Sequence, residues 1–401
     1  MRNRLRIFNT LTRKVVPFRS LSPGRVNMLV CGPTIQDFIH VGHARTYLFY
    51  DMVARYLSFL GFRTTFVLNV TDIDEGITKG AKSAEVSLSR FTSKYERAFR
   101  SDMRKLGIGT VSAYERVSRF IPEMTSQIRG LMAGGSAYKV GANIYFSVDT
   151  FPTFGRLSNQ SPEEISLHPL EIAEGKRNQA DFSLWREGVE SEQKWESPWG
   201  KGIPGWHIQD TAVSSSHYGG QYDIHGGARE LVYPHHEAVI AQMESLHGVR
   251  PAVKYWLHSG LLTQGKEKMA KSRGNAPRVR EVLKDHGVGG LRLYLLSMHH
   301  REDIEFSEAA LVKWEEAFEK LQSLSKKVED RGEGMPGRLD PSDPFFEAMN
   351  DDLRSKEAIE HLLGVARKAS EDRERDKAGN ALLLLRTASE IMGIGIFEKV
   401  K

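Results

Sequence analysis

Hydrophobic and polar positions along the first 75 residues predict a strand, a helix and a second strand. Val26 to Val30 form a short, mostly apolar run that leads into Cys31-Gly32-Pro33, as expected for a buried strand followed by a turn. From Ala44 to Leu60 apolar residues recur at helical spacing, and Gly61 stands where a helix C-cap is expected. Thr64 to Val70 is a second β-rich run. This order of elements is the opening of a doubly wound α/β domain.

The rest of the chain divides by changes in this pattern. Charge-rich helical stretches and a strand-like segment at Asn143 to Val148 predict a region inserted into the α/β domain, which resumes near Gly205. The expected parts are a Rossmann-type catalytic domain over 1–300 with an insertion at about 76–200, a helical junction over 301–331, a Pro/Gly-rich linker over 332–344 and a helical bundle over 345–401.

Composition narrows the class of protein. With 40% hydrophobic and 27% charged residues, the chain of 401 residues is typical of a soluble globular protein. No run approaches the 20 or so apolar residues of a membrane span, and the N-terminus lacks an apolar signal core, so we expect a cytoplasmic protein with no membrane partner. The net charge of +5 suits nucleic acid or a phosphate-rich substrate, but a solvated surface rich in Lys and Arg explains it as well.

The segment His40-Val41-Gly42-His43 lies at the predicted junction between strand and helix. A helix N-terminus attracts anions, and Gly42 leaves room for a ligand beside the backbone. Imidazoles at positions i and i+3 can both donate hydrogen bonds to an α-phosphate, where charge builds in the transition state. Two nearby histidines taken alone are more often surface or core residues.

A second segment, Lys268-Met269-Ala270-Lys271-Ser272, lies in a predicted loop with glycines at 265 and 274. Its two ammonium groups can hold a triphosphate and neutralise a pyrophosphate leaving group. A solvated basic loop is the commoner interpretation of such a segment alone.

Together the two segments resemble the HIGH and KMSKS signatures of class I aminoacyl-tRNA synthetases, and read here HVGH and KMAKS. The resemblance narrows to the cysteinyl-tRNA synthetase family and runs through nearly the whole chain. The strings that carry it are Cys31-Gly32-Pro33-Thr34, Gly42-His43-Ala44-Arg45-Thr46, Asn69-Val70-Thr71-Asp72-Ile73-Asp74, Lys176-Arg177-Asn178, Asp181-Phe182, Leu184-Trp185, Ser197-Pro198-Trp199-Gly200, Gly205-Trp206-His207-Ile208, Asp223-Ile224-His225-Gly226-Gly227, Pro234-His235-His236-Glu237 and 346–352.

This resemblance implies an α/β fold with a class I Rossmann-type catalytic domain, an inserted region and a C-terminal helical bundle. It implies that ATP, with Mg²⁺, activates cysteine as an adenylate, which passes its acyl group to tRNA. The residues implied are His40, His43, Lys268 and Lys271 for catalysis; Gly42, Asp223, Gly226, Gly227, Lys271 and Ser272 for ATP; and Thr71 and Trp206 for the amino acid.

The sequence departs from the family at the metal. The family's zinc ion is held by two Cys, one His and one Glu, and binds the cysteine thiolate. Cys31 and His235 keep two of these positions, whereas Asp210 and Val239 replace the second Cys and the Glu. We predict that Cys31, Asp210 and His235 hold Zn²⁺ with an open position for the substrate thiol. The alternative is a pocket without zinc, in which Cys31 is a small buried hydrophobe and the amino acid is open.

The chain also stops near the end of the helical domain, so we expect no anticodon-reading module. The first hypothesis is ATP-dependent activation of cysteine and transfer to tRNA(Cys). The second is a paralogue that transfers an activated amino acid to a small-molecule amine. The third is a non-catalytic tRNA-binding relative, against which the intact HVGH and KMAKS segments argue.

Overall fold

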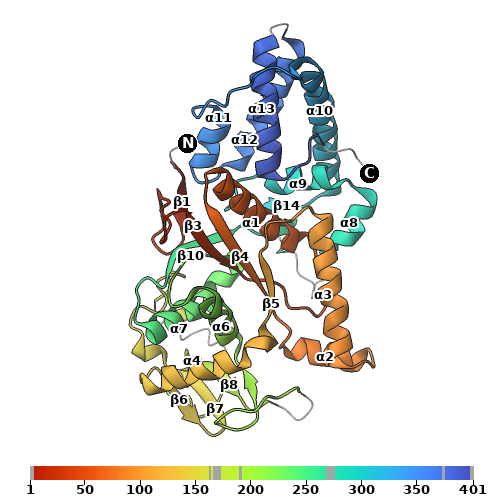
Figure 1. Cartoon of the computed structure of the whole chain (residues 1–401). Helices are drawn as coiled ribbons and strands as arrows, with labels where there is room; N and C mark the ends of the chain where they lie inside the picture. The colour runs from red at the N-terminus through yellow and green to blue at the C-terminus, as the bar shows by residue number, and fades with distance from the viewer. Residues whose placement is uncertain are drawn as a thin grey trace.

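A parallel sheet stands at the centre of the computed structural model (Figure 1), which describes residues 4–161, 164–165, 173–188, 192–265, 267–268, 276–372 and 375–397. Its strand order is β11–β10–β3–β4–β5, and every pairing in it is parallel. The strands are β3 (Arg25–Val30), β4 (Arg63–Val70), β5 (Ala113–Arg116), β10 (Tyr222–Ala228) and β11 (Val253–Ser259). The order reverses between β3 and β10, and ligands of open α/β sheets bind at such a reversal, beyond the carboxyl ends of the strands.

Each face of this sheet has its own hydrophobic core, because successive residues of a strand point to opposite sides. Met28 and Val30 pack on the side of helix α1 (Val41–Phe59), whereas Leu29 packs on the side of α6 (Trp206–Tyr218) and α7 (Glu237–His247). Since α1 lies between the sheet and the C-terminal helices, it is apolar on most of its circumference. The predicted strand, helix and strand are confirmed within three residues at each end.

The region between β5 and α6 forms a smaller layer at the bottom of Figure 1, and its hydrophobic core is continuous with that on one face of the central sheet. Its antiparallel sheet has the order β6–β7–β8–β9. The elements of this region are η1 (Val117–Phe120), α4 (Ile121–Ala133), β6 (Ala137–Val140), β7 (Asn143–Phe146), η2 (Val148–Thr150), β8 (Phe182–Arg186) and β9 (Ile203–Pro204). Helices α2 (Glu75–Ser83) and α3 (Leu88–Lys105) precede β5.

The inserted region therefore begins later than the expected residue 76. Strand β5 lies inside the range 76–200, yet it pairs with β4 and completes the central sheet. Its sequence, Ala-Tyr-Glu-Arg, has no buried residue, because β5 is the edge strand of the sheet. Such a strand lacks the apolar run by which a buried parallel strand is found.

The C-terminal helices form a bundle at the top of Figure 1. They are α10 (Glu308–Gly332), α11 (Pro344–Asn350), α12 (Ser355–Glu371) and α13 (Arg375–Met392), preceded by α8 (Val279–Asp285) and α9 (Val288–Leu296). Because α10 packs against both α12 and α13, the expected junction over 301–331 mostly belongs to the bundle.

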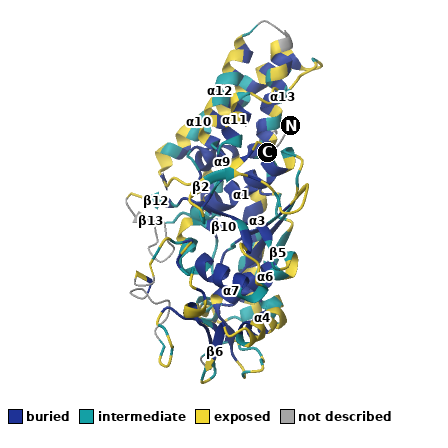
Figure 2. Cartoon of the chain, turned by 90° about the vertical axis from the view of Figure 1, so that its left-hand side faces the viewer, coloured by how far each residue is buried: buried dark blue, intermediate teal, exposed yellow. Residues whose placement is uncertain are grey.

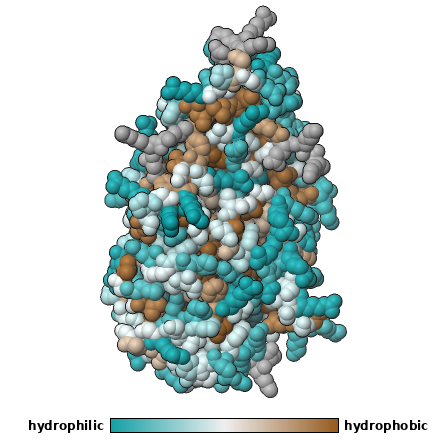
Figure 3. Space-filling view, in the orientation of Figure 1, coloured by the Kyte–Doolittle hydropathy of each residue, from teal (hydrophilic) through white to brown (hydrophobic). Residues whose placement is uncertain are grey.

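Short strands and turns complete the chain. The remaining elements are β1 (Arg6–Asn9), β2 (Lys14–Pro17), η3 (Arg229–Leu231), η4 (Val232–His236), β12 (Leu262–Gln264), β13 (Glu267–Lys268) and β14 (Ile304–Glu305). Figure 2 shows the buried residues concentrated in the central sheet and in α1, α6 and α7. On the face drawn in Figure 3, hydrophilic side chains predominate, and hydrophobic ones gather towards the C-terminal helices. Of the helices that the structure describes, none has the length and apolar content needed to cross a bilayer.

A buried ion pair joins the bundle to α1. Arg292 is 1% exposed, and its guanidinium donates to Asp51 at 2.8 Å and to the carbonyl oxygen of Met392 at 2.9 Å. Arg55 donates to the same carboxylate at 2.8 Å and to the carbonyl of Glu390 at 3.2 Å. The last carbonyls of a helix lack partners within it, so these two cations both satisfy them and complement the dipole of α13.

Candidate active site

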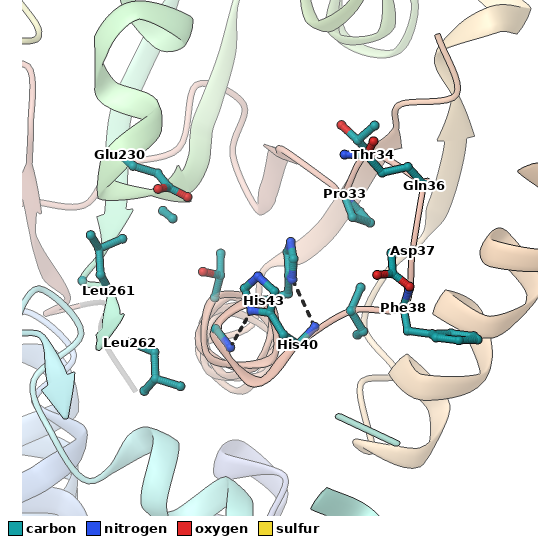
Figure 4. A pocket seen from close by; sticks show the side chains of 15 residues that line it. Pro33, Thr34, Gln36, Asp37, Phe38, His40, His43, Glu230, Leu261 and Leu262 are labelled. Atoms are coloured by element: carbon teal, nitrogen blue, oxygen red, sulfur yellow. Dashed lines mark hydrogen bonds between the residues drawn. The ribbon is translucent and has the colours of Figure 1, made fainter. Parts of the chain in front are cut away.

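An open cavity lies beyond the carboxyl ends of β3, β10 and β11, where the strand order reverses (Figure 4). Its walls come from three segments that follow those strands and from the first turns of α1. The lining residues are Pro33, Thr34, Gln36, Asp37, Phe38, Ile39, His40, Gly42, His43, Thr46, Ala228, Glu230, Gly260, Leu261 and Leu262. The cavity therefore has the position that the topology predicts for a nucleotide.

His40 and His43 form the N-terminus of α1 and lie side by side, with ring centroids 3.9 Å apart. The Nδ1 atom of His40 accepts the N–H of Gly42 at 3.1 Å, and that of His43 accepts the N–H of His40 at 3.3 Å. Since both Nδ1 atoms accept, the neutral rings carry their proton on Nε2. The helix end thus combines two imidazole donors with a positive dipole, which suits phosphate oxygens.

The ring of His40 lies against Gly42, and a side chain at position 42 would collide with it. A Cβ atom at this position would lie 2.9 Å from two atoms of that ring. Gly42 also lines the cavity, as the sequence predicted, so any side chain here would push the imidazole away from the helix end.

The other predicted ATP residues lie around the cavity or apart from it. Gly226 and Gly227 lie near the carboxyl end of β10, directly before its last residue, Ala228, which lines the cavity. Asp223 lies at the opposite end of that strand, where its carboxylate accepts the backbone N–H of Leu21 at 2.6 Å and of Asn27 at 2.9 Å. The structure thus gives Asp223 a role in holding the backbone and does not bring it to the cavity.

The KMAKS segment falls largely outside the described residues. Lys271 and Ser272 are not described, and for Lys268 the structure gives only its backbone, which pairs with Thr263 in β12–β13. The chain after the segment returns to the histidines, because the N–H of Val41 donates to Pro277 at 3.0 Å and that of Val279 to Ile39 at 3.0 Å. Residues 277–279, which follow the segment, are therefore held against the start of α1.

A cluster of metal-ligand type lies near the carboxyl ends of β3 and β10, and none of its residues is among those that line the cavity. The Sγ atom of Cys31 is 3.2 Å from Nε2 of His236 and 3.5 Å from Nε2 of His225. Each imidazole is held through its other nitrogen, His236 by His258 at 2.8 Å and His225 by the hydroxyl of Tyr222 at 2.5 Å. This arrangement, in which a neighbour orients each ring, is common at metal sites.

The predicted ligand Asp210 reaches the edge of this cluster. Its Oδ2 is 3.7 Å from Sγ of Cys31, and its Oδ1 accepts from the side-chain amide of Asn69 at 2.5 Å. Burial raises the pKa of Asp210 to about 7, although its contact with Cys31 acts in the opposite direction. Burial and the nearby Asp210 raise the pKa of Cys31, and burial lowers that of His225 to about 3. Without a metal, the thiol is therefore protonated and the imidazole neutral.

His235 is not brought into this cluster. Its Nδ1 is 3.0 Å from Nε2 of His207, and its ring lies 5.1 Å from that of Trp206. Of the described histidines, His225 and His236 are the ones that group with Cys31 as possible ligands. Both stand in strings that carry the family resemblance, but the sequence offered no signal to prefer His236 over the adjacent His235.

Trp206 and His235 belong to a second open cavity, between the central sheet and the inserted region. Trp206 is 44% exposed there, and Gln209 and His207 also contribute to its wall. Thr71, the other residue predicted for the amino acid, is buried and pairs through its backbone with Thr34, which lines the first cavity. Thr71 is not among the lining residues of either cavity, so the structure does not bring the two predicted pocket residues together on one cavity.

The family model and two relatives found by sequence agree on one family. The family model described as tRNA synthetases class I (C) catalytic domain matches residues 17–316. A cysteine–tRNA ligase of Thermoplasma acidophilum is 39% identical over 99% of this chain and 89% of its own length. Another, of Thermoplasma volcanium, is 42% identical over 80% of this chain and 71% of its own length.

Solved structures share the fold. A LeuRS of Agrobacterium radiobacter K84, in a ternary complex with tRNA and LeuAMS, superposes with a TM-score of 0.68 at 11% identity, over 94% of this chain and 85% of that one. A methionyl-tRNA synthetase of Mycobacterium tuberculosis, in complex with methionyl-adenylate, gives 0.66 at 15% identity, over 92% and 90%. With a family model that spans three quarters of its length and relatives that match from end to end, this chain belongs to the cysteinyl-tRNA synthetase family of class I aminoacyl-tRNA synthetases.

Proposed function

We propose that this chain activates cysteine with ATP to cysteinyl-adenylate and transfers the cysteinyl group to tRNA(Cys). The observation that carries the proposal is the pair of imidazoles at the N-terminus of α1, within a cavity at the reversal of a class I sheet. The names of the relatives, cysteine–tRNA ligases, supply the amino acid and the acceptor.

In the first step, a carboxylate oxygen of cysteine attacks the α-phosphorus of ATP, and the bond to pyrophosphate breaks. His40 and His43 are proposed to donate hydrogen bonds where negative charge builds on the phosphate. Lys268 and Lys271 are proposed to neutralise the pyrophosphate, with the Mg²⁺ that accompanies ATP, and Ser272 to bind the phosphates beside them. In the second step a ribose hydroxyl of tRNA attacks the acyl carbon and AMP leaves. The enzyme acts chiefly by orientation and charge stabilisation.

The donors around Cys31 fit a zinc ion. For tetrahedral zinc, with sulfur at about 2.3 Å and nitrogen at about 2.0 Å, the two donors stand about 3.5 Å apart. The separations from Cys31 to His236 and His225, 3.2 and 3.5 Å, agree with this. We propose that Cys31, His225 and His236 hold the metal, with Asp210 beside it. When bound, zinc would supply a Lewis acid that takes the substrate thiol as thiolate.

Pyrophosphate exchange into ATP, measured with each of the twenty amino acids, tests the activation step. Cysteine alone should support exchange, and only tRNA(Cys) should then be charged. Exchange that favours another amino acid would overturn the assignment of cysteine. Adenylate formation without charging of any tRNA would replace tRNA by another acceptor, such as a small amine.

Metal analysis of single variants separates the two possible ligand sets. His236→Ala and His225→Ala should lose zinc, whereas His235→Ala should retain it. His247→Ala, which alters a histidine near the end of α7, is the matched control. The reverse pattern, with zinc lost in His235→Ala and kept in His236→Ala, would establish the ligands that the sequence predicted.

A further inference from the structure

Helix α1 contacts β11 and the residues after it at three successive levels. The hydroxyl of Tyr50 lies 2.7 Å from the carbonyl oxygen of Leu257, and the hydroxyl of Thr46 lies 3.1 Å from that of Ser259. The guanidinium of Arg45 then reaches the carbonyl of Leu261 at 3.5 Å. Helix and strand run in opposite directions here. Each contact in this series therefore lies closer to the cavity than the one before it.

The spacing between successive contacts on the helix nearly equals the spacing on the strand. Thr46 and Tyr50 are four residues apart on a helix, a rise of about 6 Å. Leu257 and Ser259 are two residues apart on a strand, a rise of about 6.6 Å. Because the two distances nearly agree, one ridge of α1 stays in contact with one side of β11.

The Tyr50 hydroxyl also joins β11 to β10. It accepts the N–H of Gly227 at 2.7 Å while it donates to Leu257, and Tyr50 is 0% exposed. A Cβ atom on Gly226 would lie 2.4 Å from the Tyr50 ring, so a glycine is needed for the ring to reach this position. One buried hydroxyl thus ties the carboxyl ends of two neighbouring strands to the helix.

The residues just beyond this tie form one wall of the cavity. Ala228 follows Gly227 directly, and Gly260 and Leu261 come shortly after Leu257. The facing wall carries His40 and His43, at the N-terminus of the same helix. Any shift of Tyr50 relative to the strand ends would therefore alter the width of the cavity.

We propose that Tyr50 is a positioning residue for ATP, whose hydroxyl fixes the distance between the histidines and the wall formed after β10 and β11. The proposal rests on the assignment of this cavity to ATP under the proposed function. Removing the hydroxyl leaves a buried N–H and a buried C=O without this partner, and buried polar groups shift to regain hydrogen bonds. The wall then moves and ATP binds less well. The Tyr50 hydroxyl bonds the backbone of Gly227 and Leu257 and not the side chains around Cys31, so the effect on cysteine should be smaller.

The test is Tyr50→Phe, which deletes only the hydroxyl, assayed by pyrophosphate exchange. The KM for ATP should rise about tenfold, the scale of one lost hydrogen bond, while the KM for cysteine stays within about twofold. Tyr56→Phe is the matched control, since Tyr56 is also buried on α1 but its hydroxyl bonds Asn350 of the bundle at 3.0 Å. This control should change neither KM.

An unchanged KM for ATP in Tyr50→Phe would overturn the proposal. Equal rises in both KM values would overturn it too, because they would mark a general loss of structure. If Tyr50→Phe does not fold, Ser259→Ala carries the test through the next contact along the strand and should raise the KM for ATP about threefold. If the wild type activates a different amino acid, the proposed function fails, yet the ATP comparison still decides the role of Tyr50.

Discussion

His43 shows how much of the proposed chemistry depends on a single side chain. Its ring is fixed by the N–H of His40 and lies in the cavity wall. His43→Ala should lower pyrophosphate exchange about 100-fold, the scale of one lost donor to a transition-state oxyanion. His361→Ala, on α12 of the bundle, is the control and should leave exchange unchanged. Exchange at the wild-type rate in His43→Ala would remove the histidine from the reaction.

Asp210 lies at the edge of the metal cluster, at a position for which the sequence predicted a ligand. Its carboxylate stands 3.7 Å from the Cys31 sulfur, within reach of a shared ion. Asp210→Cys should raise zinc affinity, because thiolate is a softer ligand than carboxylate. Competition against a chelator of known affinity measures this change, and Asp210→Ala should bind zinc no better than the wild type. Equal affinity of Asp210→Cys and the wild type would place residue 210 outside the ligands.

The sequence predicted which residues lie together only where those residues belong to one short segment. His40, Gly42 and His43 lie within four positions of one another, so their grouping follows from a local turn, and the structure places all three on one cavity. The cluster of Cys31, His225 and His236 depends on three distant segments and on which of two adjacent histidines faces inward. No local pattern decides that choice. The predicted roles of Lys268, Lys271, Ser272, Thr71 and Trp206 stay predictions.

At the scale of elements, the junction of α8 and α9 depends on one histidine. The ring nitrogens of His286 lie 2.7 Å from Glu315 and 2.5 Å from Glu308, both on α10. Burial lowers the pKa of His286, but the two carboxylates outweigh it and raise that pKa above its usual value. A raised pKa means that protonation stabilises the fold below the unfolded value of about 6.5, and that this stability is lost as the pH rises through the folded value.

His286→Gln should therefore lower the free energy of unfolding by about 1 kcal/mol at pH 6, as for a half-exposed ion pair. The difference from the wild type should shrink as the pH rises above neutrality. Urea unfolding at pH 6 and pH 9 measures it, with Glu315→Gln as a partner variant that should show the same trend. A loss that is equal at both pH values would mean that the charge of His286 contributes nothing.

Elements with a clear pattern agree with their prediction, and those without one do not. The apolar runs of β3 and β4 and the periodicity of α1 predicted these three elements, because each is buried in the core of the sheet. Strand β5 was assigned to the insertion, since an exposed edge needs no apolar side chains. The α/β class followed from the order of elements, whereas the strand order required the tertiary structure.

For the whole molecule, the docking of the bundle onto α1 depends on Gly393. This residue has φ +65°, and a Cβ atom on it would lie 2.1 Å from the Arg292 guanidinium. Gly393→Ala should destabilise the protein by about 2 kcal/mol, the sum of left-handed strain and a displaced buried cation. Because we expect the bundle to bind tRNA, the rate of tRNA charging in Gly393→Ala should fall further than the rate of pyrophosphate exchange.

Gly364→Ala is the control for this prediction. Gly364 lies within α12, and a Cβ atom there would meet nothing within 4 Å. Alanine favours a helix over glycine by about 1 kcal/mol, so this variant should be slightly more stable than the wild type. Thermal unfolding, with exchange and charging assays on the same preparations, distinguishes the two glycines. Equal losses of exchange and charging in Gly393→Ala would show that the docking serves stability alone.

The contact between α1 and β11 also limits how this chain can change in length. One residue added between His43 and Thr46 would turn everything before it by about 100° around the helix. The two histidines would then face away from the cavity while Thr46 and Tyr50 kept their places on the strand. A substitution along this helix changes one side chain, whereas an insertion or deletion would displace both histidines at once. The number of residues between His40 and Tyr50 is therefore a feature of the site. Homologous chains should differ in the residue types of this stretch more often than in its length.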